Sequence, residues 1–137
     1  MTQPTWADAT APSLDDFAAL AAAAFAALPR KFRRMARDVV LRVDDFPGDD
    51  VLDDLGLESP FELTGLYQGV DLARRSVLDP SPEPARVFLY RRPILDEWAE
   101  RGDVTLSELI AHVLTHEIGH HFGLSDEDID AIEASAE

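Results

Sequence analysis

The sequence contains no cysteine among its 137 residues. This excludes a disulfide framework and any zinc site built on thiolates, and it fits a reducing compartment. The longest apolar run, over residues 17–29, is too short to span a bilayer. The N-terminal residues also lack the basic and apolar segments of a secretory signal peptide. From these absences we expect a cytoplasmic protein.

Basic residues are scarce as well: 12 lysines and arginines face 27 aspartates and glutamates, which gives a net charge of −15. A chain with this charge is repelled by phosphate backbones and anionic lipid, so neither nucleic acid nor a membrane surface is expected as a partner. Residues 30–37 hold five of the basic residues, whereas residues 44–60 hold seven acids and no base. Solvated surface segments explain both stretches, and a second cation site in 44–60 is the alternative.

The length and the composition, with 46% hydrophobic and 28% charged residues, are typical of one soluble globular domain. Residues 1–12 contain two prolines and no periodic pattern, so we expect a flexible N-terminal arm followed by a single domain over 13–137.

Hydrophobic periodicity and turn residues predict an α+β fold, with a small sheet of about three strands packed on helices. Ser13 is expected to cap a helix that ends at Pro29, and Pro93 is expected to end the third strand or to place it at the sheet margin. The acidic stretch after the first strand is interpreted as a long loop. The predicted strands are 38–46, 64–70 and 86–93, and the further predicted helices are 31–37, 94–101, one opening at Thr105, and 126–134.

The helix that opens at Thr105 carries the motif "HEIGH". His116 and His120 are four residues apart, so an α-helix places both imidazoles on one face, within reach of one ion. Glu117 projects beside that face, where it can accept a proton from a zinc-bound water as the water attacks a carbonyl. Gly123, three residues past His120, lets the chain leave the helix and return toward the metal.

The stretch "HEIGHHFGLSD" resembles the H-E-x-x-H-x-x-G-x-x-D motif of zincin metallopeptidases, and the chain from about residue 14 to 133 resembles the small bacterial zincin-like metallopeptidases. Supporting segments are "VVLRVDDFP", "LTGLYQGVDL" and "RVFLYRRPIL". The resemblance implies a minimal zincin-like fold with H-E-x-x-H on a helix in the C-terminal region. It also implies a Zn²⁺ cofactor, a peptide or protein substrate, His116 and His120 as zinc ligands, and Glu117 as the general base.

The extended motif implies Asp126 as the third zinc ligand. The methionine turn of the metzincins has no counterpart here, because the only methionines are Met1 and Met35. Other acids of the final segment therefore stay open as alternative ligands: Glu133, as in zincins that take a glutamate from a later helix, and also Glu127 and Asp130.

Four further residues are candidates near the site. Tyr90 and Tyr67 are possible donors to the oxyanion or to a ligand, with packing in the sheet as the alternative. The strand over 86–93 is the candidate edge that pairs with an extended substrate. His112 is expected to be exposed or structural, and His121 to point away from the zinc face. The function predicted from these residues is a zinc hydrolase, most simply a metallopeptidase. A metal-binding regulatory protein with little turnover and a zinc amidase for a non-peptide substrate are the alternatives.

Overall fold

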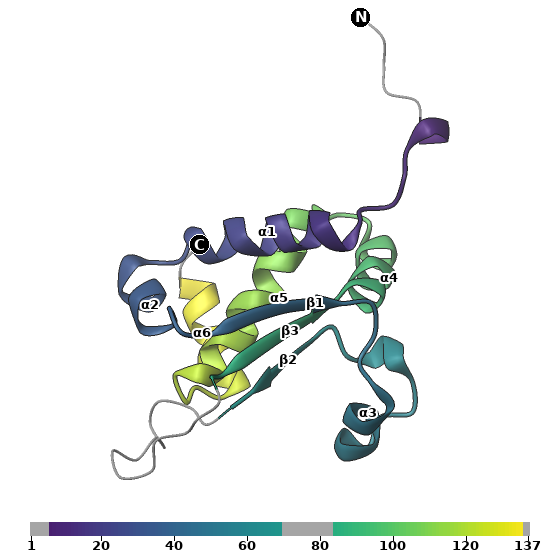
Figure 1. The fold of residues 1–137 in the computed structure, drawn as a ribbon. Helices are drawn as coiled ribbons and strands as arrows, with labels where there is room; N and C mark the ends of the chain where they lie inside the picture. Colours follow the sequence, from purple (N-terminus) through teal and green to yellow (C-terminus); the bar gives the residue numbers. More distant parts are fainter. Residues whose placement is uncertain (1–5, 70–83, 136–137) are drawn as a thin grey trace, which may run out of the picture.

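The computed structural model describes residues 6–69 and 84–135, without the side chains of residues 130 and 132–135 (Figure 1). Helices and three short strands form an α+β fold, as the hydrophobic periodicity and turn residues predicted. The elements are η1 (Trp6–Asp8), α1 (Leu14–Ala26), α2 (Arg30–Met35), β1 (Val40–Asp44), α3 (Asp49–Leu55), η2 (Pro60–Glu62), β2 (Gly65–Gln68), β3 (Arg86–Tyr90), α4 (Arg91–Arg101), α5 (Leu106–His121) and α6 (Asp126–Ser135).

The sheet has the order β1-β3-β2, with β1 parallel and β2 antiparallel to β3. The prediction that residues 86–93 form a free edge strand is therefore wrong, because β3 is paired on both sides. Pro93 does not mark a sheet margin. It lies buried in the first turn of α4, where the missing N–H of proline removes no hydrogen bond within the helix. Helix α4 accordingly begins at Arg91, three residues earlier than predicted.

One face of the sheet carries the core. Val87 and Leu89 of the central strand are fully buried, and Leu41 and Val43 of β1 pack against the same cluster. Helices α1 and α5 cover this face and contact one another, as Figure 1 shows. The apolar stripe of α5 lies in the middle of the core, so the helix that carries "HEIGH" is held along most of its length.

Side-chain caps fix where the helices begin. Ser13 forms a reciprocal capping box with Asp16, and Thr105 accepts a hydrogen bond from the backbone N–H of Glu108 at 3.0 Å. Ser125 and Asp128 form a second reciprocal pair at the start of α6. These contacts confirm the predicted starts of α1, α5 and α6.

The acidic stretch after β1 was predicted to be a long loop. This prediction is wrong, because the stretch contains α3. Asp49 and Asp50 lie in its first turn, where negative charge interacts favourably with the positive end of the helix dipole. Gly56 ends the helix in the left-handed conformation, with φ 68°. Among the described residues, no helix combines the length and apolarity that crossing a membrane requires.

Candidate metal centre

Helix α5 places two imidazoles side by side on its solvent-facing side. The ring centroids of His116 and His120 are 5.4 Å apart, and both side chains are about one-quarter to one-third exposed. The buried stripe of α5, which includes the fully buried Ile110 and Leu114, packs into the core beside them. The core therefore fixes the rotation of the helix, and with it the direction of both histidines.

A Schellman turn returns the chain to the histidines after α5. The backbone N–H of Gly123 donates to the His120 carbonyl at 3.0 Å, and that of Leu124 donates to the Gly119 carbonyl at 3.2 Å. Gly123 has φ 79°, a left-handed conformation that ends the helix and turns the chain back, as predicted. Helix α6 starts two residues after Leu124, with Asp126 as its first residue.

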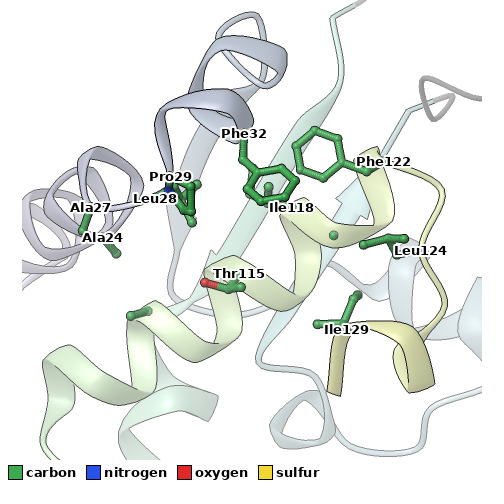
Figure 2. Close-up of a pocket in the computed structure, with 12 residues that line it drawn as sticks. Ala24, Ala27, Leu28, Pro29, Phe32, Thr115, Ile118, Phe122, Leu124 and Ile129 are labelled. Atoms are coloured by element: carbon green, nitrogen blue, oxygen red, sulfur yellow. The ribbon is translucent and has the colours of Figure 1, made fainter. Parts of the chain in front are cut away.

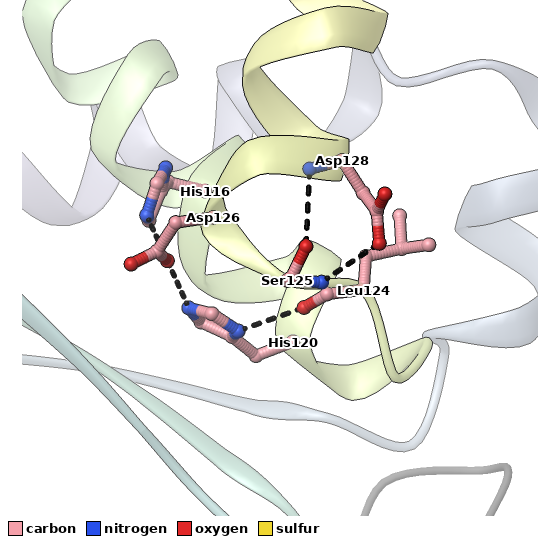
Figure 3. A network of polar contacts seen from close by, with 6 residues as sticks. All are labelled: His116, His120, Leu124, Ser125, Asp126 and Asp128. Carbon is pink, nitrogen blue, oxygen red and sulfur yellow. Dashed lines mark hydrogen bonds and ion pairs between the residues drawn. The ribbon is translucent and has the colours of Figure 1, made fainter.

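Asp126 reaches both rings from the start of α6 (Figure 3). Its Oδ1 atom lies 2.8 Å from Nε2 of His116 and 3.1 Å from Nε2 of His120. Its side chain is 72% exposed, so the cluster is open to solvent on one side. One ligand atom from each of the three residues lies within 4.8 Å of the others, a spacing that a single ion can span.

The hydrogen bonding of His120 suits a cation at this point. Its Nδ1 atom lies 3.1 Å from the Leu124 carbonyl oxygen and must carry a proton to donate to it. In the neutral imidazole, Nε2 then has a lone pair that faces the Asp126 carboxylate at 3.1 Å. The lone pair of Nε2 and the carboxylate oxygen are both acceptors, and a proton or a metal ion between them stabilises the pair. Backbone carbonyls that accept from Nδ1 commonly orient metal-binding histidines.

Of the alternative ligands, the structure describes the side chain of Glu127. Glu127 is exposed on the first turn of α6 and is not part of the cluster. The side chains of Asp130 and Glu133 lie outside the described residues. Within the described part of the chain, His116, His120 and Asp126 form the group that can hold a metal, and the second cation site considered for residues 44–60 is not found.

Glu117 lies half-buried between α5 and the sheet edge. Burial raises the pKa of its carboxyl group, with a smaller increase from Asp126, whereas His120 and His116 lower the pKa, as does a hydrogen bond from the Tyr67 backbone N–H. A raised pKa makes this carboxylate a better proton acceptor. The hydrogen bond also shows that β2 lies directly against the carboxylate.

A glycine, Gly65, allows strand β2 to lie against α5. A Cβ atom on Gly65 would lie 2.7 Å from Cγ1 of Val113 and 3.2 Å from Cγ of Glu117, so only glycine permits so close an approach. The Tyr90 N–H donates to the Thr64 carbonyl, so Thr64 points its backbone groups toward β3. In an antiparallel pair, successive residues of a strand point their backbone groups alternately toward and away from the partner strand. The backbone groups of Gly65 and Tyr67 therefore point away from β3, along the free edge of the sheet.

The two tyrosine phenols have different surroundings. The Tyr67 hydroxyl lies 2.8 Å from Nδ1 of His121, a histidine that is only 3% exposed and faces away from His116, as predicted. Tyr90 is 2% exposed, and burial together with the Asp44, Asp50 and Glu117 carboxylates raises its pKa to about 12.

The sequence pattern attributed a role to the Tyr67 phenol, but its backbone N–H is the group that contacts Glu117. No periodicity or motif marks a backbone donor, so this contact could be found only by placing β2 in space. His112 is exposed, as predicted, with its ring centroid 6.2 Å from that of His116.

An apolar cavity of about 340 Å³ lies on the other side of α5, between α1, α2 and α6 (Figure 2). Its lining side chains are apolar except for Thr115, and the rings of Phe32 and Phe122 meet at one end. None of the lining groups can bind a metal or transfer a proton at neutral pH. The chemistry of the molecule is therefore expected on the histidine side of α5.

Comparison with protein families assigns this arrangement to a class. The family model described as zincin-like metallopeptidase matches residues 36–136, which is most of the chain. The chain belongs to this family, and the three-stranded mixed sheet with its helices is consistent with a minimal zincin-like fold. The predicted family and fold class are confirmed. A search among curated proteins found no match.

Proposed function

We propose that the protein is a zinc-dependent peptidase in which His116, His120 and Asp126 hold the metal and Glu117 acts as the general base. The observation that supports this most strongly is the convergence of two imidazole nitrogens and one carboxylate oxygen from two helices. Two histidines and one acid are a donor set that catalytic zinc uses, because three protein ligands leave a position open for water or substrate.

Each residue of the site contributes a separate step. The Leu124 carbonyl holds His120 in the tautomer whose Nε2 lone pair is available. When bound, zinc lowers the pKa of a coordinated water to about 7 and polarises the substrate carbonyl. The Glu117 carboxylate accepts the proton that the attacking water loses and can return it to the departing amine. Its raised pKa suits both transfers.

The substrate backbone is proposed to lie along β2 rather than along β3. The outward-pointing backbone N–H and C=O groups of Gly65 offer a peptide the hydrogen bonds of an additional strand. This edge adjoins Glu117, so a peptide held there has a carbonyl close to the base and the metal-binding group. Tyr67 and Tyr90 are proposed as the two candidate donors to the oxyanion.

The test compares zinc content and peptide cleavage of the wild type with those of Glu117→Gln. Glutamine keeps the shape of the side chain but cannot accept the proton, so cleavage should fall by about 10²- to 10⁴-fold while zinc binding is retained. His120→Ala should lose both zinc and cleavage. A peptide library read by mass spectrometry, with metal analysis of the same samples, measures both quantities.

Equal cleavage by the wild type and Glu117→Gln would contradict the proposal. Zinc binding without cleavage of any library peptide would favour a regulatory metal-binding protein. Cleavage of small amides but not of peptides would favour an amidase.

A further inference from the structure

A pocket of about 190 Å³ opens directly beside the general base. Thr64, at the entry to β2, forms one wall and Arg101 of α4 forms another, while His116 and Glu117 of α5 border it on the metal side. Pockets that enclose whole drug-sized ligands begin at about 300 Å³, so this space suits one amino-acid side chain or a chain terminus. A group that fills it lies next to the bond being hydrolysed.

Arg101 is the cationic residue of this pocket, whose lining also includes the carboxylates of Glu97 and Glu117. Among the described residues that line it, Arg101 is the one arginine or lysine. It is the last residue of α4, and its side chain is 48% exposed. Its Nε atom lies 3.1 Å from Oε2 of Glu97, one helical turn earlier. The protein has a net charge of −15, so a positively charged guanidinium beside the reaction centre contrasts with the negative charge of the chain as a whole.

The contact with Glu97 leaves Arg101 able to bind a second acid. A guanidinium carries five N–H donors in a planar fork, and Nε supplies only one of them. Glu97 thus orients the fork, while the donors on the two terminal nitrogens can engage a carboxylate in bidentate fashion. A substrate carboxylate can join this pair without breaking it. A substrate ammonium would have to compete with Arg101 for Glu97 and would lie beside the guanidinium charge.

We propose that this pocket selects substrates with a carboxylate adjacent to the scissile bond, and that Arg101 is the residue that determines this specificity. The inference rests on the proposed peptidase function. The carboxylate can come from an aspartate or glutamate side chain or from the C-terminus of the peptide. Both sources present the same chemistry to Arg101, and the experiment separates them.

The experiment uses the zinc-loaded full chain and quenched fluorescent peptides that differ at one position beside the cleaved bond. That position carries glutamate, glutamine or lysine, each with a free or an amidated C-terminus. A charge-assisted hydrogen bond contributes about 1.5–3 kcal/mol, so kcat/KM for the carboxylate peptide should exceed that of its neutral counterpart by about tenfold or more. The pair that shows the difference, glutamate against glutamine or free against amidated, identifies the source.

Three variants assign the effect to Arg101. Arg101→Gln should abolish the preference for the carboxylate, and Glu97→Gln should retain it. Arg92→Gln is the matched control, because Arg92 lies on the same helix, is exposed and does not line the pocket; it should leave the preference unchanged. Peptides cleaved with the same preference in Arg101→Gln as in the wild type would overturn the inference and leave the peptidase function intact. A preference for lysine that Glu97→Gln removes would also overturn it.

A binding measurement keeps the two proposals distinguishable. The same peptides, labelled for fluorescence anisotropy, are titrated into zinc-loaded Glu117→Gln protein, which binds without turnover. Tighter binding of the carboxylate peptide, lost when Arg101→Gln is added, supports the inference even if the wild type cleaves none of the peptides. Equal binding of all peptides would overturn it.

Discussion

Gly119 lies inside the H-E-x-x-H motif at the point where α6 packs against α5. A Cβ atom there would lie 2.5 Å from both Cδ1 and Cγ1 of Ile129, whose side chain is 2% exposed. Replacing glycine by alanine inside a helix usually stabilises it by about 1 kcal/mol. Here the added methyl group should push α6 away from α5. We expect Gly119→Ala to destabilise the protein by about 1–3 kcal/mol, as overpacking does.

Zinc affinity should fall in the same variant, because α6 carries Asp126. Urea denaturation and calorimetric zinc titration measure the two effects. The control is Ile129→Ala, which removes the clashing atoms, so the double variant should lose less stability than the sum of the two single changes. A Gly119→Ala protein that is more stable than the wild type, with unchanged zinc affinity, would contradict this account of α6.

Tyr90 provides a test at alkaline pH. The folded protein keeps the phenol proton up to about pH 12, whereas an unfolded chain loses it at the ordinary tyrosine pKa of 10.0. The stabilising contribution of the protonated phenol is therefore complete below pH 10 and is lost as the pH rises toward 12. The free energy of unfolding should fall over this interval, and less steeply in Tyr90→Phe. Ultraviolet difference titration of the two proteins should give a Tyr90 midpoint near pH 12, and a midpoint near 10 would contradict the burial argument.

At the scale of elements, β2 positions the base through its contact with α5. Gly65 permits that contact, since a Cβ atom would meet Val113 and Glu117. We expect Gly65→Ala to displace β2 and to leave zinc affinity unchanged. The displacement should reduce kcat by up to about 10²-fold, the loss that a 1 Å misplacement at a reaction centre can cause. Zinc should stay bound because the metal-binding side chains come from α5 and α6. Gly56→Ala at the end of α3 is a control away from the site, because it strains a left-handed glycine without touching α5. A matching fall in kcat in that variant would count against a specific role of Gly65.

Local signals predicted the individual elements well. The capping residues Ser13, Thr105 and Ser125 each mark a helix start, because their hydroxyl groups bond to backbone N–H groups only three residues away. The spacing of His116 and His120 likewise predicted a shared helix face. These features depend on residues close in sequence, so the sequence alone contains the information.

The features that were missed depend on pairing between distant segments. The central position of β3 follows from its pairing with two strands that precede it in the chain, and no pattern within residues 86–93 specifies those partners. The pocket beside Glu117 forms where α4 packs against α5, so the spacing of Arg101 from the motif gave no indication of it. The helix in the acidic stretch was missed because proline and glycine flank it closely.

At the scale of the whole molecule, 27 acids against 12 bases should make the folded state sensitive to ionic strength. Mutual repulsion of negative charge disfavours the compact state, and salt shortens the Debye length from about 30 Å at 0.01 M to about 8 Å at 0.15 M. We expect the thermal unfolding midpoint at pH 7 to rise over this range of sodium chloride. A falling midpoint would mean that screened attractions outweigh the repulsion.

The control for this effect is pH. Near the isoelectric point of about 4.4 the net charge is close to zero, so the same increase in salt should change the midpoint much less. A salt effect of equal size at both pH values would show that general ion effects, rather than the net charge, cause it.

The central claim concerns the metal and its third ligand. A crystal structure of the zinc-loaded protein, with anomalous data collected at the zinc edge, tests it most directly. The account predicts one zinc ion bound by Nε2 of His116, Nε2 of His120 and the carboxylate of Asp126, with Glu117 beside it but not coordinating. An ion whose third ligand is Glu133, or no ion between the two histidines at saturating zinc, would contradict it.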